Sequence, residues 1–245
     1  MEEYRKEYIG SGLAVFVSDD HTFGTDAVLL ADFASPSAKS KCCDLGSGCG
    51  IIPILWCKKK TGPITAVEIS EKATDQIRAA VEYNNLEERI TAINSDLNEL
   101  KGKIEFGSFN LITMNPPYTA DGSGIISTSQ ADKIARHGTM CSFDDICKVS
   151  SKLLNFGGKL CMCIRPERMT ELFVLMQKYG IEPKRIKFVS KRPGCSPWLI
   201  LIEGRRGGKS GMKVEPELFV YGNTNEYSPE MKKIYADYLL ENRGE

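Results

Sequence analysis

Three short segments of the chain combine side chains that could bind a ligand or take part in a reaction. A glycine-rich turn, Asp44-Leu45-Gly46-Ser47-Gly48-Cys49-Gly50, lies between two apolar runs. The segments Asn94-Ser95-Asp96-Leu97 and Asn115-Pro116-Pro117-Tyr118 each follow a run of apolar and β-branched residues. A fourth candidate, Glu68, ends such a run itself. These residue types favour cofactor binding and hydrogen bonding to a substrate over metal chemistry or covalent catalysis.

The glycine-rich turn has the composition of a ligand-binding loop. Glycines let the backbone turn tightly and come close to a ligand, and the helix expected after them exposes free N–H groups. Glu68, at the end of the next expected strand, could accept hydrogen bonds from both ribose hydroxyls of an adenosine cofactor. The competing interpretation is a glycine-rich turn that exists only for packing, because short motifs also occur by chance.

The Asn-Pro-Pro-Tyr segment suits a reaction at an amino nitrogen. Two prolines remove two backbone donors and stiffen the turn, which leaves carbonyl oxygens and the Asn115 side-chain oxygen as acceptors. An exocyclic or amide nitrogen is a poor nucleophile because its lone pair is delocalised. Acceptors at its two N–H groups can draw it toward a tetrahedral geometry, which is catalysis by positioning and electrostatics. Tyr118 could stack on an unpaired base. The alternative is a proline-rich strand exit.

The hydrophobic pattern alternates between strands and helices around these segments. An upstream helix is expected to begin near Thr25 or Asp26, either of which could cap it. The order favours an α/β fold with a mostly parallel sheet, in which the last two strands are joined by a loop and are antiparallel. Strands are predicted over residues 41–45, 64–68, 89–93, 108–114, 159–164, 185–190 and 198–203. Helices are predicted over residues 51–59, 70–85, 143–154, 166–179 and 228–240, with an edge strand over 217–221.

Composition narrows the class of protein further. The 245 residues carry 32 Lys+Arg and 32 Asp+Glu, and 42% of them are hydrophobic, which is typical of a globular protein. No apolar run is long enough for a membrane span, and the charged start, Met1 to Lys6, predicts no secretory signal. Most of the nine cysteines are interpreted as small buried hydrophobes in a reducing cytosol. With no C-x2-C pair, no metal is expected.

One stretch of the neutral chain is locally basic. Nine Lys and Arg residues but only two acids, Glu182 and Glu203, lie between Glu182 and Lys213. The functional interpretation is a surface that follows the phosphates of a nucleic acid, and the alternative is a solvated face.

Taken together, the motifs resemble a known family. Residues 44–50 match the E/D-x-G-x-G-x-G pattern of motif I in class I methyltransferases, and Asn115-Pro116-Pro117-Tyr118 is similar to motif IV of enzymes that methylate amino nitrogens. Phe23 to Leu30 and Ala135-Arg136-His137 look like the tRNA1(Val) adenine-N6 methyltransferase family. The resemblance spans roughly residues 20–205. It implies a Rossmann-like class I methyltransferase fold, with a mostly parallel seven-stranded sheet, an antiparallel last strand and helices on both faces.

The resemblance also implies a cofactor, a partner and a set of site residues. The cofactor is S-adenosylmethionine and the partner is RNA, with adenine N6 in tRNA as the target atom and the base flipped into the site. Residues 1–38 are expected to pack over the cofactor site, 39–207 to form the catalytic domain and 208–245 to form a tail. The implied catalytic residues are Asn115, Pro116 and Tyr118. The implied cofactor-binding residues are Thr25, Asp26, Asp44, Gly46, Ser47, Gly48, Gly50, Glu68, Ile69, Asp96, Leu97 and Asn115. The implied substrate-binding residues are Pro117, Tyr118, Lys133, Arg136, His137, Lys191 and Arg192.

Several alternatives stay open on the sequence. A glutamine-amide methyltransferase acting on a release factor also carries Asn-Pro-Pro-Tyr but usually has a larger N-terminal domain. An enzyme that methylates guanine N2 or adenine N6 in ribosomal RNA is a further candidate, as is a DNA-adenine enzyme, for which no recognition domain is visible. A nicotinamide-dependent oxidoreductase is disfavoured by Ile51, which stands where a dinucleotide fingerprint needs glycine. An RNA-binding module on a methyltransferase scaffold would have no need of the intact Asn-Pro-Pro-Tyr motif. For Asp96, a helix N-cap is an alternative that is compatible with ligand binding.

Overall fold

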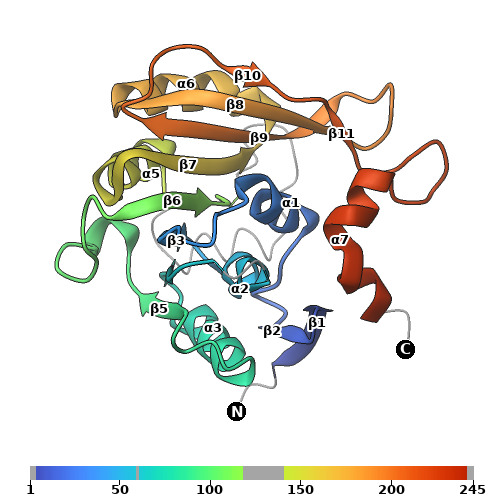
Figure 1. Cartoon of the computed structure of the whole chain (residues 1–245), viewed down its shortest axis with the longest axis horizontal. Coiled ribbons are helices and arrows are strands. Elements are labelled where there is room, and N and C mark those ends of the chain that lie inside the picture. Colours follow the sequence, from blue (N-terminus) through green and yellow to red (C-terminus); the bar gives the residue numbers. More distant parts are fainter. Residues whose placement is uncertain (1–3, 59–60, 118–140, 242–245) are drawn as a thin grey trace.

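A computed structural model of the chain describes residues 4–58, 61–117 and 141–241, with the side chains of 236–241 excepted. Its centre is a mixed sheet in which seven long strands are adjacent (Figure 1). In order across the sheet these are β5 (Ile90–Asn94), β4 (Ile64–Glu68), β3 (Cys42–Leu45), β6 (Phe109–Met114), β7 (Leu154–Ile164), β9 (Pro197–Arg206) and β8 (Ile181–Ser190). β9 runs antiparallel to both of its neighbours, and the other pairs are parallel. The predicted mixed α/β sheet is confirmed.

The sheet is wider than the seven strands expected from the resemblance. After β9 the chain returns along the outer edge of β8 and adds two short parallel strands, β10 (Lys213–Val214) and β11 (Leu218–Phe219). These strands satisfy backbone groups that an open β8 edge would otherwise present to solvent. Of the two, only β11 falls in the predicted edge strand, over 217–221.

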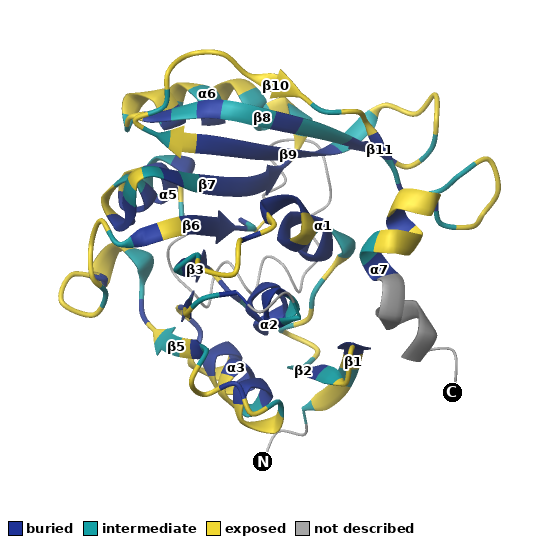
Figure 2. Ribbon diagram, viewed as in Figure 1, coloured by how far each residue is buried: buried dark blue, intermediate teal, exposed yellow. Residues whose placement is uncertain are grey.

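Helices cover both faces of the sheet and bury two separate cores (Figure 2). One face packs against α1 (Thr25–Ala34), α2 (Ile51–Cys57) and α3 (Glu71–Tyr83), and the other against α5 (Phe143–Leu153) and α6 (Met169–Lys178). Neighbouring residues of a strand point to opposite faces, so Cys42 belongs to the first core and Cys43 to the second. Burial raises the pKa of the Cys42 thiol to about 12, as expected of an unreactive core residue.

The N-terminal segment forms a hairpin that the mixed composition of the first residues did not predict. β1 (Arg5–Gly10) and β2 (Leu13–Val17) pair antiparallel and form a separate two-stranded sheet. The Asn84 side chain, just after α3, exchanges two hydrogen bonds with the backbone of Ala14, at 2.9 and 2.7 Å. Gln76 of α3 donates to the Phe16 carbonyl oxygen at 3.1 Å. The hairpin is therefore fixed to α3 by side chains from distant parts of the chain.

The C-terminal helix α7 (Pro229–Glu241) lies beside the N-terminal part of the fold. It contacts β1 and α1, so the two ends of the chain pack together (Figure 1). Tyr221, Tyr227 and Tyr235 stack in sequence, with ring centroids 5.4 Å apart in each pair. No helix in the described ranges is both long and apolar enough to cross a bilayer.

Candidate active site

The three chemical motifs meet at the carboxyl edge of adjacent parallel strands. Leu45 pairs with Met114 in the register of β3 and β6, so the glycine-rich turn and the Asn-Pro-Pro segment leave the sheet side by side. Glu68 pairs with Asn94 in the register of β4 and β5, which brings the acidic residue next to the Asn94–Leu97 segment. Ligands of open α/β sheets bind at this edge.

The three glycines of the turn have different structural reasons for being glycine. All three have positive φ, at 63° for Gly46, 54° for Gly48 and 81° for Gly50. A Cβ atom at Gly46 would lie 3.1 Å from the Met114 side chain, and one at Gly50 would lie 3.1 Å from Ile77. A Cβ at Gly48 would have no atom of the described structure within 4 Å. Packing thus accounts for Gly46 and Gly50, whereas Gly48 borders open space that a ligand could fill.

Asp44 holds the turn in place from inside the protein. Its side chain is buried and accepts hydrogen bonds of 2.6 Å from both the Ser47 and the Thr113 hydroxyls. Burial raises the pKa of the Asp44 carboxyl to about 7, although the two hydrogen bonds oppose that shift. Both carboxylate oxygens are engaged within the fold, which makes Asp44 and Ser47 supports of the turn.

Glu68 joins the glycine-rich turn to the start of α3. One carboxylate oxygen accepts from the Gly48 backbone N–H at 2.8 Å and the other from the Ser70 N–H at 2.9 Å. The Ser70 side chain caps α3, accepting from the Ala73 N–H at 3.4 Å. Next to Glu68, the Ile69 side chain is 48% exposed at the same edge of the sheet. An acidic acceptor and an apolar surface therefore border the open space at Gly48.

The Asp96 segment follows β5 at the neighbouring position. Asp96 caps the single-turn helix η1 (Leu97–Glu99) by accepting from the Asn98 N–H at 2.8 Å through one oxygen, Oδ1. Leu97 is partly buried against the core that α5 covers. The predicted cap is present, and it is compatible with a ligand contact through the second oxygen.

Asn115 is held by residues from two other elements. Its side-chain nitrogen donates to Oδ2 of Asp26 in α1 at 3.1 Å, and its side-chain oxygen accepts from the Cys163 thiol of β7 at 3.0 Å. Pro116 is buried and Pro117 is exposed. Asp26 was predicted at the site, but Cys163 was not. The signal for Cys163 lies in the register of β6 and β7, because Met114 pairs with Met162.

The start of α1 differs from the prediction. The N-cap residue is Gly24, not Thr25 or Asp26, and no side chain caps the helix. The Thr25 hydroxyl accepts a hydrogen bond of 3.1 Å from Tyr235 of α7, and the Asp26 carboxylate contacts Asn115. Both side chains are therefore used in tertiary contacts instead of a local cap.

A histidine for which the sequence indicates no role lies near the acidic end of the site. Nε2 of His21 is 3.2 Å from the Ser70 hydroxyl, and Gln76 donates to the His21 carbonyl oxygen at 3.2 Å. His21 is one of only two histidines in the chain. No spacing pattern links it to Ser70, because the loop after β2 brings the two together.

The remaining predicted contacts divide into two groups. Tyr118, Lys133, Arg136 and His137 lie outside the described residues. Lys191 and Arg192 lie on the connection between β8 and β9, where the Arg192 guanidinium donates to the Asn225 side chain and lies 5.7 Å from the Tyr221 ring centroid. Lys191 is exposed.

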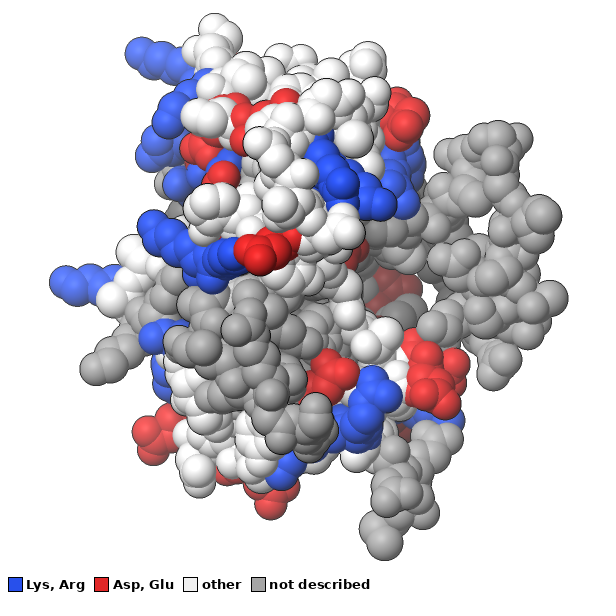
Figure 3. Space-filling view, turned by 90° about the vertical axis from the view of Figure 1, so that its right-hand side faces the viewer, with Lys and Arg blue, Asp and Glu red and all other residues white. Residues whose placement is uncertain are grey.

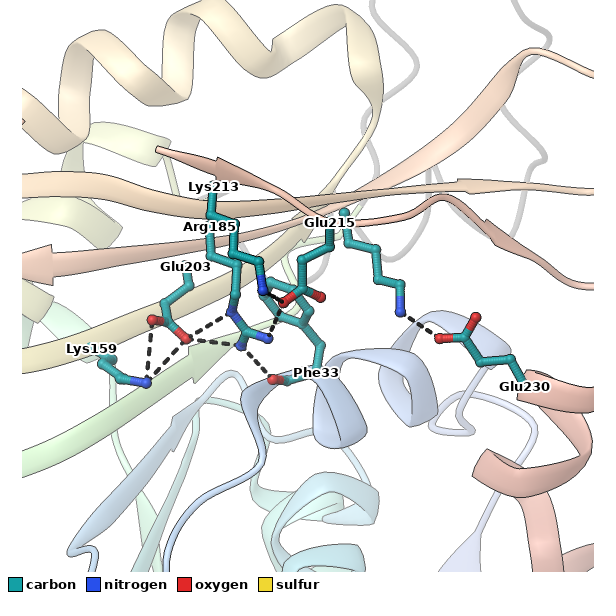
Figure 4. A network of polar contacts seen from close by, with 8 residues as sticks. Phe33, Lys159, Arg185, Glu203, Lys213, Glu215 and Glu230 are labelled. Carbon is teal, nitrogen blue, oxygen red and sulfur yellow. Dashed lines mark hydrogen bonds and ion pairs between the residues drawn. The ribbon is translucent and has the colours of Figure 1, made fainter. Parts of the chain in front are cut away.

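Much of the basic stretch over 184–213 is paired within the protein. Arg185 donates to Glu203 at 2.8 Å, to Glu215 at 3.2 Å and to the Phe33 carbonyl oxygen at 2.7 Å (Figure 4). Lys187 forms an ion pair with Glu230. On the side of the molecule seen in Figure 3, Lys and Arg lie in several separate groups with Asp and Glu beside most of them. The expected phosphate-following surface is wrong at Arg185 and Lys187, because acids distant in sequence neutralise them.

The described residues contain no group of three or more His, Cys, Asp or Glu side chains arranged to hold a metal ion. The site instead offers backbone N–H groups, carboxylates and amide oxygens around an open edge of the sheet. Such a set of groups is suited to binding a nucleoside and to accepting hydrogen bonds from an amine.

Comparison with known proteins identifies the family. Residues 8–179 match the model of the methyltransferase small domain. A relative from Parabacteroides distasonis, named tRNA1(Val) (adenine(37)-N6)-methyltransferase, is 28% identical over 217 residues, which cover 89% of this chain and 90% of the relative. A protein of the same name from Bacteroides thetaiotaomicron is 26% identical over 89% of this chain and 90% of its own length.

Solved structures agree on the fold. A predicted O-methyltransferase from Agrobacterium tumefaciens superposes with a TM-score of 0.69 at 19% identity, covering 87% of this chain and 97% of that one. A methyltransferase from Pyrococcus furiosus gives a TM-score of 0.58 at 16% identity, covering 80% of this chain and 90% of that one. With the family model matched over most of the chain and the motifs assembled at one edge of the sheet, the chain belongs to the methyltransferase small domain family.

Proposed function

We propose that this enzyme transfers a methyl group from S-adenosylmethionine to the exocyclic N6 atom of an adenine in tRNA. The observation that carries the proposal is the position of Asn115-Pro116-Pro117 at the end of β6, directly beside the glycine-rich turn. Relatives named for tRNA adenine-N6 methylation align with the chain over about nine-tenths of both lengths and support the choice of acceptor.

The described residues fit the cofactor. The open space at Gly48, the Glu68 carboxylate and the exposed Ile69 side chain lie together at the carboxyl edge of the sheet. Glu68 would accept hydrogen bonds from ribose hydroxyls, and Ile69 and Leu97 would pack on the adenine with Asp96 accepting from its amine. When bound, the cofactor supplies a sulfonium methyl group that is already activated for transfer.

The residues of the Asn-Pro-Pro segment position the acceptor amine. Asn115 accepts one N–H of the amine through its side-chain oxygen, and the Pro116 carbonyl oxygen accepts the other. These contacts orient the nitrogen lone pair toward the methyl carbon. S-adenosylmethionine would supply the methyl group, and the methylated nitrogen would release one proton to water while Asn115 and the Pro116 carbonyl oxygen hold the amine in place. Because the nitrogen becomes more acidic as it is alkylated, acceptors already in place stabilise the transition state more than the ground state.

The segments around this centre have proposed roles as well. Residues 1–38 cover the cofactor side of the site, residues 39–207 form the catalytic domain, and the tail over 208–245 supports the N-terminal cover. Tyr118 stacks on the flipped adenine. Lys133, Arg136 and His137 contact the RNA, with Lys191 and Arg192 at the rim. The enzyme acts in the cytoplasm, where its tRNA substrate is.

A direct comparison of acceptors tests this function. The purified protein is incubated with methyl-labelled S-adenosylmethionine and, separately, with unmodified tRNA, ribosomal RNA and a release-factor protein. The expected result is incorporation of label into tRNA. Label in the protein alone would identify a glutamine amide, and not adenine N6, as the methylated group. Label in ribosomal RNA alone would identify ribosomal RNA as the substrate.

A further inference from the structure

The Asn115 side chain lies between two partners of opposite hydrogen-bonding character. Oδ2 of Asp26 is 3.1 Å from the Asn115 nitrogen, and Sγ of Cys163 is 3.0 Å from the Asn115 oxygen. A carboxylate only accepts hydrogen bonds, whereas a thiol is a weak donor. The three residues come from α1, from the end of β6 and from β7. Two elements that are distant in sequence therefore determine which way the amide faces.

An amide side chain can turn by half a rotation with almost no change in shape. In the turned state the Asn115 oxygen would face the Asp26 carboxylate, so that two acceptors would meet without a proton between them. The acceptor oxygen would then be directed at α1 and could not accept a hydrogen bond from a substrate amine. The Asp26 carboxylate excludes that state, because it offers the amide nitrogen a charged acceptor in only one orientation.

The Cys163 thiol satisfies the Asn115 oxygen without occupying it fully. A thiol is a much weaker donor than a hydroxyl or an N–H group, and an amide oxygen has two lone pairs. The oxygen can therefore keep the thiol contact or exchange it at small cost when an amine donates to it. We infer that Asp26 is a positioning residue of the methyl transfer: its carboxylate holds the Asn115 amide with the acceptor oxygen directed away from α1. This inference rests on the function proposed above.

Asp26 is itself fixed by its surroundings. It lies in the first turn of α1, and its other oxygen accepts from the Ala27 N–H at 3.0 Å. Most of α1 is buried, which keeps the helix from moving. A Cβ atom at Gly24 would lie 2.6 Å from that same oxygen. Glycine at position 24 therefore leaves room for the side-chain conformation that reaches Asn115.

Gly24 provides a test that leaves every charged residue in place. Its backbone conformation is an ordinary one, with φ at −113°, so alanine fits there without backbone strain. The methyl group would instead displace the end of the Asp26 side chain. Gly24→Ala should therefore reproduce the effect of Asp26→Ala on turnover. Asp26→Asn should lie between the wild type and Asp26→Ala, because one orientation of the new amide can still accept from Asn115.

The experiment measures kcat and KM on unmodified tRNA and, separately, the cofactor dissociation constant by calorimetry. The variants are Asp26→Ala, Asp26→Asn and Gly24→Ala, with Asp19→Ala as a matched control from the exposed loop before α1. We expect kcat to fall about 100-fold in Asp26→Ala, the size of effect that a misplaced catalytic group produces. The cofactor dissociation constant should stay within about twofold, since the carboxylate acts on Asn115.

Two results would overturn the inference. An unchanged kcat in Asp26→Ala would show that Asn115 needs no support from α1. Weaker cofactor binding with a normal kcat at saturation would make Asp26 a cofactor ligand instead.

A second readout does not depend on turnover. In the ¹⁵N-labelled protein, the side-chain amide signal of Asn115 is assigned by its loss in Asn115→Ala. It should shift in Asp26→Ala and in Gly24→Ala but not in Asp19→Ala. An unmoved signal would contradict the Asp26 contact even if the wild type methylates tRNA. If the wild type methylates none of the acceptors but the Asn115 signal still shifts in Asp26→Ala and Gly24→Ala, the proposed function is contradicted and the Asp26 contact is supported.

Discussion

The Glu68 carboxylate accepts a hydrogen bond of 2.8 Å from the Gly48 backbone N–H, which links the acidic end of β4 to the glycine of the turn whose Cβ position has no described atom within 4 Å. The contact places a charged acceptor at the position where we propose that the cofactor ribose binds. It also explains how the Glu68 carboxylate can be buried, with only 8% of the residue exposed, because both of its oxygens accept hydrogen bonds from backbone N–H groups.

Replacement of Glu68 by alanine should weaken cofactor binding without unfolding the protein. Hydrogen bonds to a charged group contribute about 1.5–3 kcal/mol each, so the dissociation constant should rise at least about tenfold. Calorimetry with S-adenosylmethionine measures the change. Glu71→Ala, on the exposed side of the first turn of α3, is the matched control and should bind normally. Equal affinities in the two variants would remove Glu68 from the cofactor site.

The buried Asp44 carboxyl predicts a pH dependence of stability. Its pKa in the folded protein is raised to about 7, above the ordinary value of 3.8, because burial disfavours the charged form. The folded state therefore holds a proton that the unfolded state has released between roughly pH 4 and pH 7. Its contribution to stability is fully present below pH 4 and is lost as the pH rises through 7.

Asp44→Asn removes this titration and keeps a polar group between Ser47 and Thr113. We expect the melting temperature of the wild type, relative to that of Asp44→Asn, to fall as the pH is raised from 5 to 8. The full effect of a shift of this size is on the order of 4 kcal/mol. Parallel melting curves at all pH values would mean that Asp44 is ionised in the folded protein throughout that range.

Asn115→Ala should lower turnover by at least about 100-fold while the cofactor still binds. The substitution removes the acceptor for the amine but leaves the glycine-rich turn and Glu68 in place. Loss of one such catalytic contact costs roughly 100-fold to 1,000-fold in kcat. Steady-state kinetics on tRNA and calorimetry with the cofactor separate the two properties. Near-normal turnover would eliminate the role assigned to the Asn115 oxygen.

Arg185 and Lys191 should behave differently although both lie in the basic stretch. Arg185 is engaged with Glu203 and Glu215, and its side chain is only 22% exposed. Arg185→Ala should therefore lower the free energy of unfolding by roughly 1.5–3 kcal/mol, the contribution of a hydrogen bond to a charged group. The buried Glu203 would keep only its ion pair with Lys159. The substitution should leave the KM for tRNA unchanged.

The exposed Lys191 gives the opposite expectation. Lys191→Ala should leave the melting temperature unchanged and raise the KM for tRNA, more so at low salt. If Arg185→Ala instead raises the KM for tRNA at unchanged stability, Arg185 belongs to the phosphate-contacting surface that the sequence indicated.

The sequence alone predicted those features that depend on local pattern. β4 begins and ends at the predicted residues because a β-branched run is bounded by a proline turn and by the N-cap Ser70. The order of the strands placed the glycine-rich turn, Glu68 and Asn115 at one edge, since parallel strands share a carboxyl end. The shared position of these residues at one edge of the sheet therefore follows from the order of the strands.

What the sequence could not predict depends on contacts between distant residues. Asp26 and Asn115 are 89 positions apart, and no local pattern relates the first turn of α1 to the end of β6. For the same reason the N-cap was assigned to a residue whose side chain is used elsewhere. The pairing of Arg185 with Glu203 crosses from β8 to β9, so a count of charges along the chain could not detect it.

The most direct test of the central claim is the chemical identity of the methylated nucleoside. Unmodified tRNA is treated with the enzyme and S-adenosylmethionine, digested to nucleosides and analysed by mass spectrometry against N6-methyladenosine, N1-methyladenosine and N2-methylguanosine standards. The proposed function predicts N6-methyladenosine, formed by the wild type and at least about 100-fold more slowly by Asn115→Ala. A methyl group on N1 of adenine or on guanine would contradict it, because the acceptors of the Asn-Pro-Pro segment would then serve a different atom or a different base.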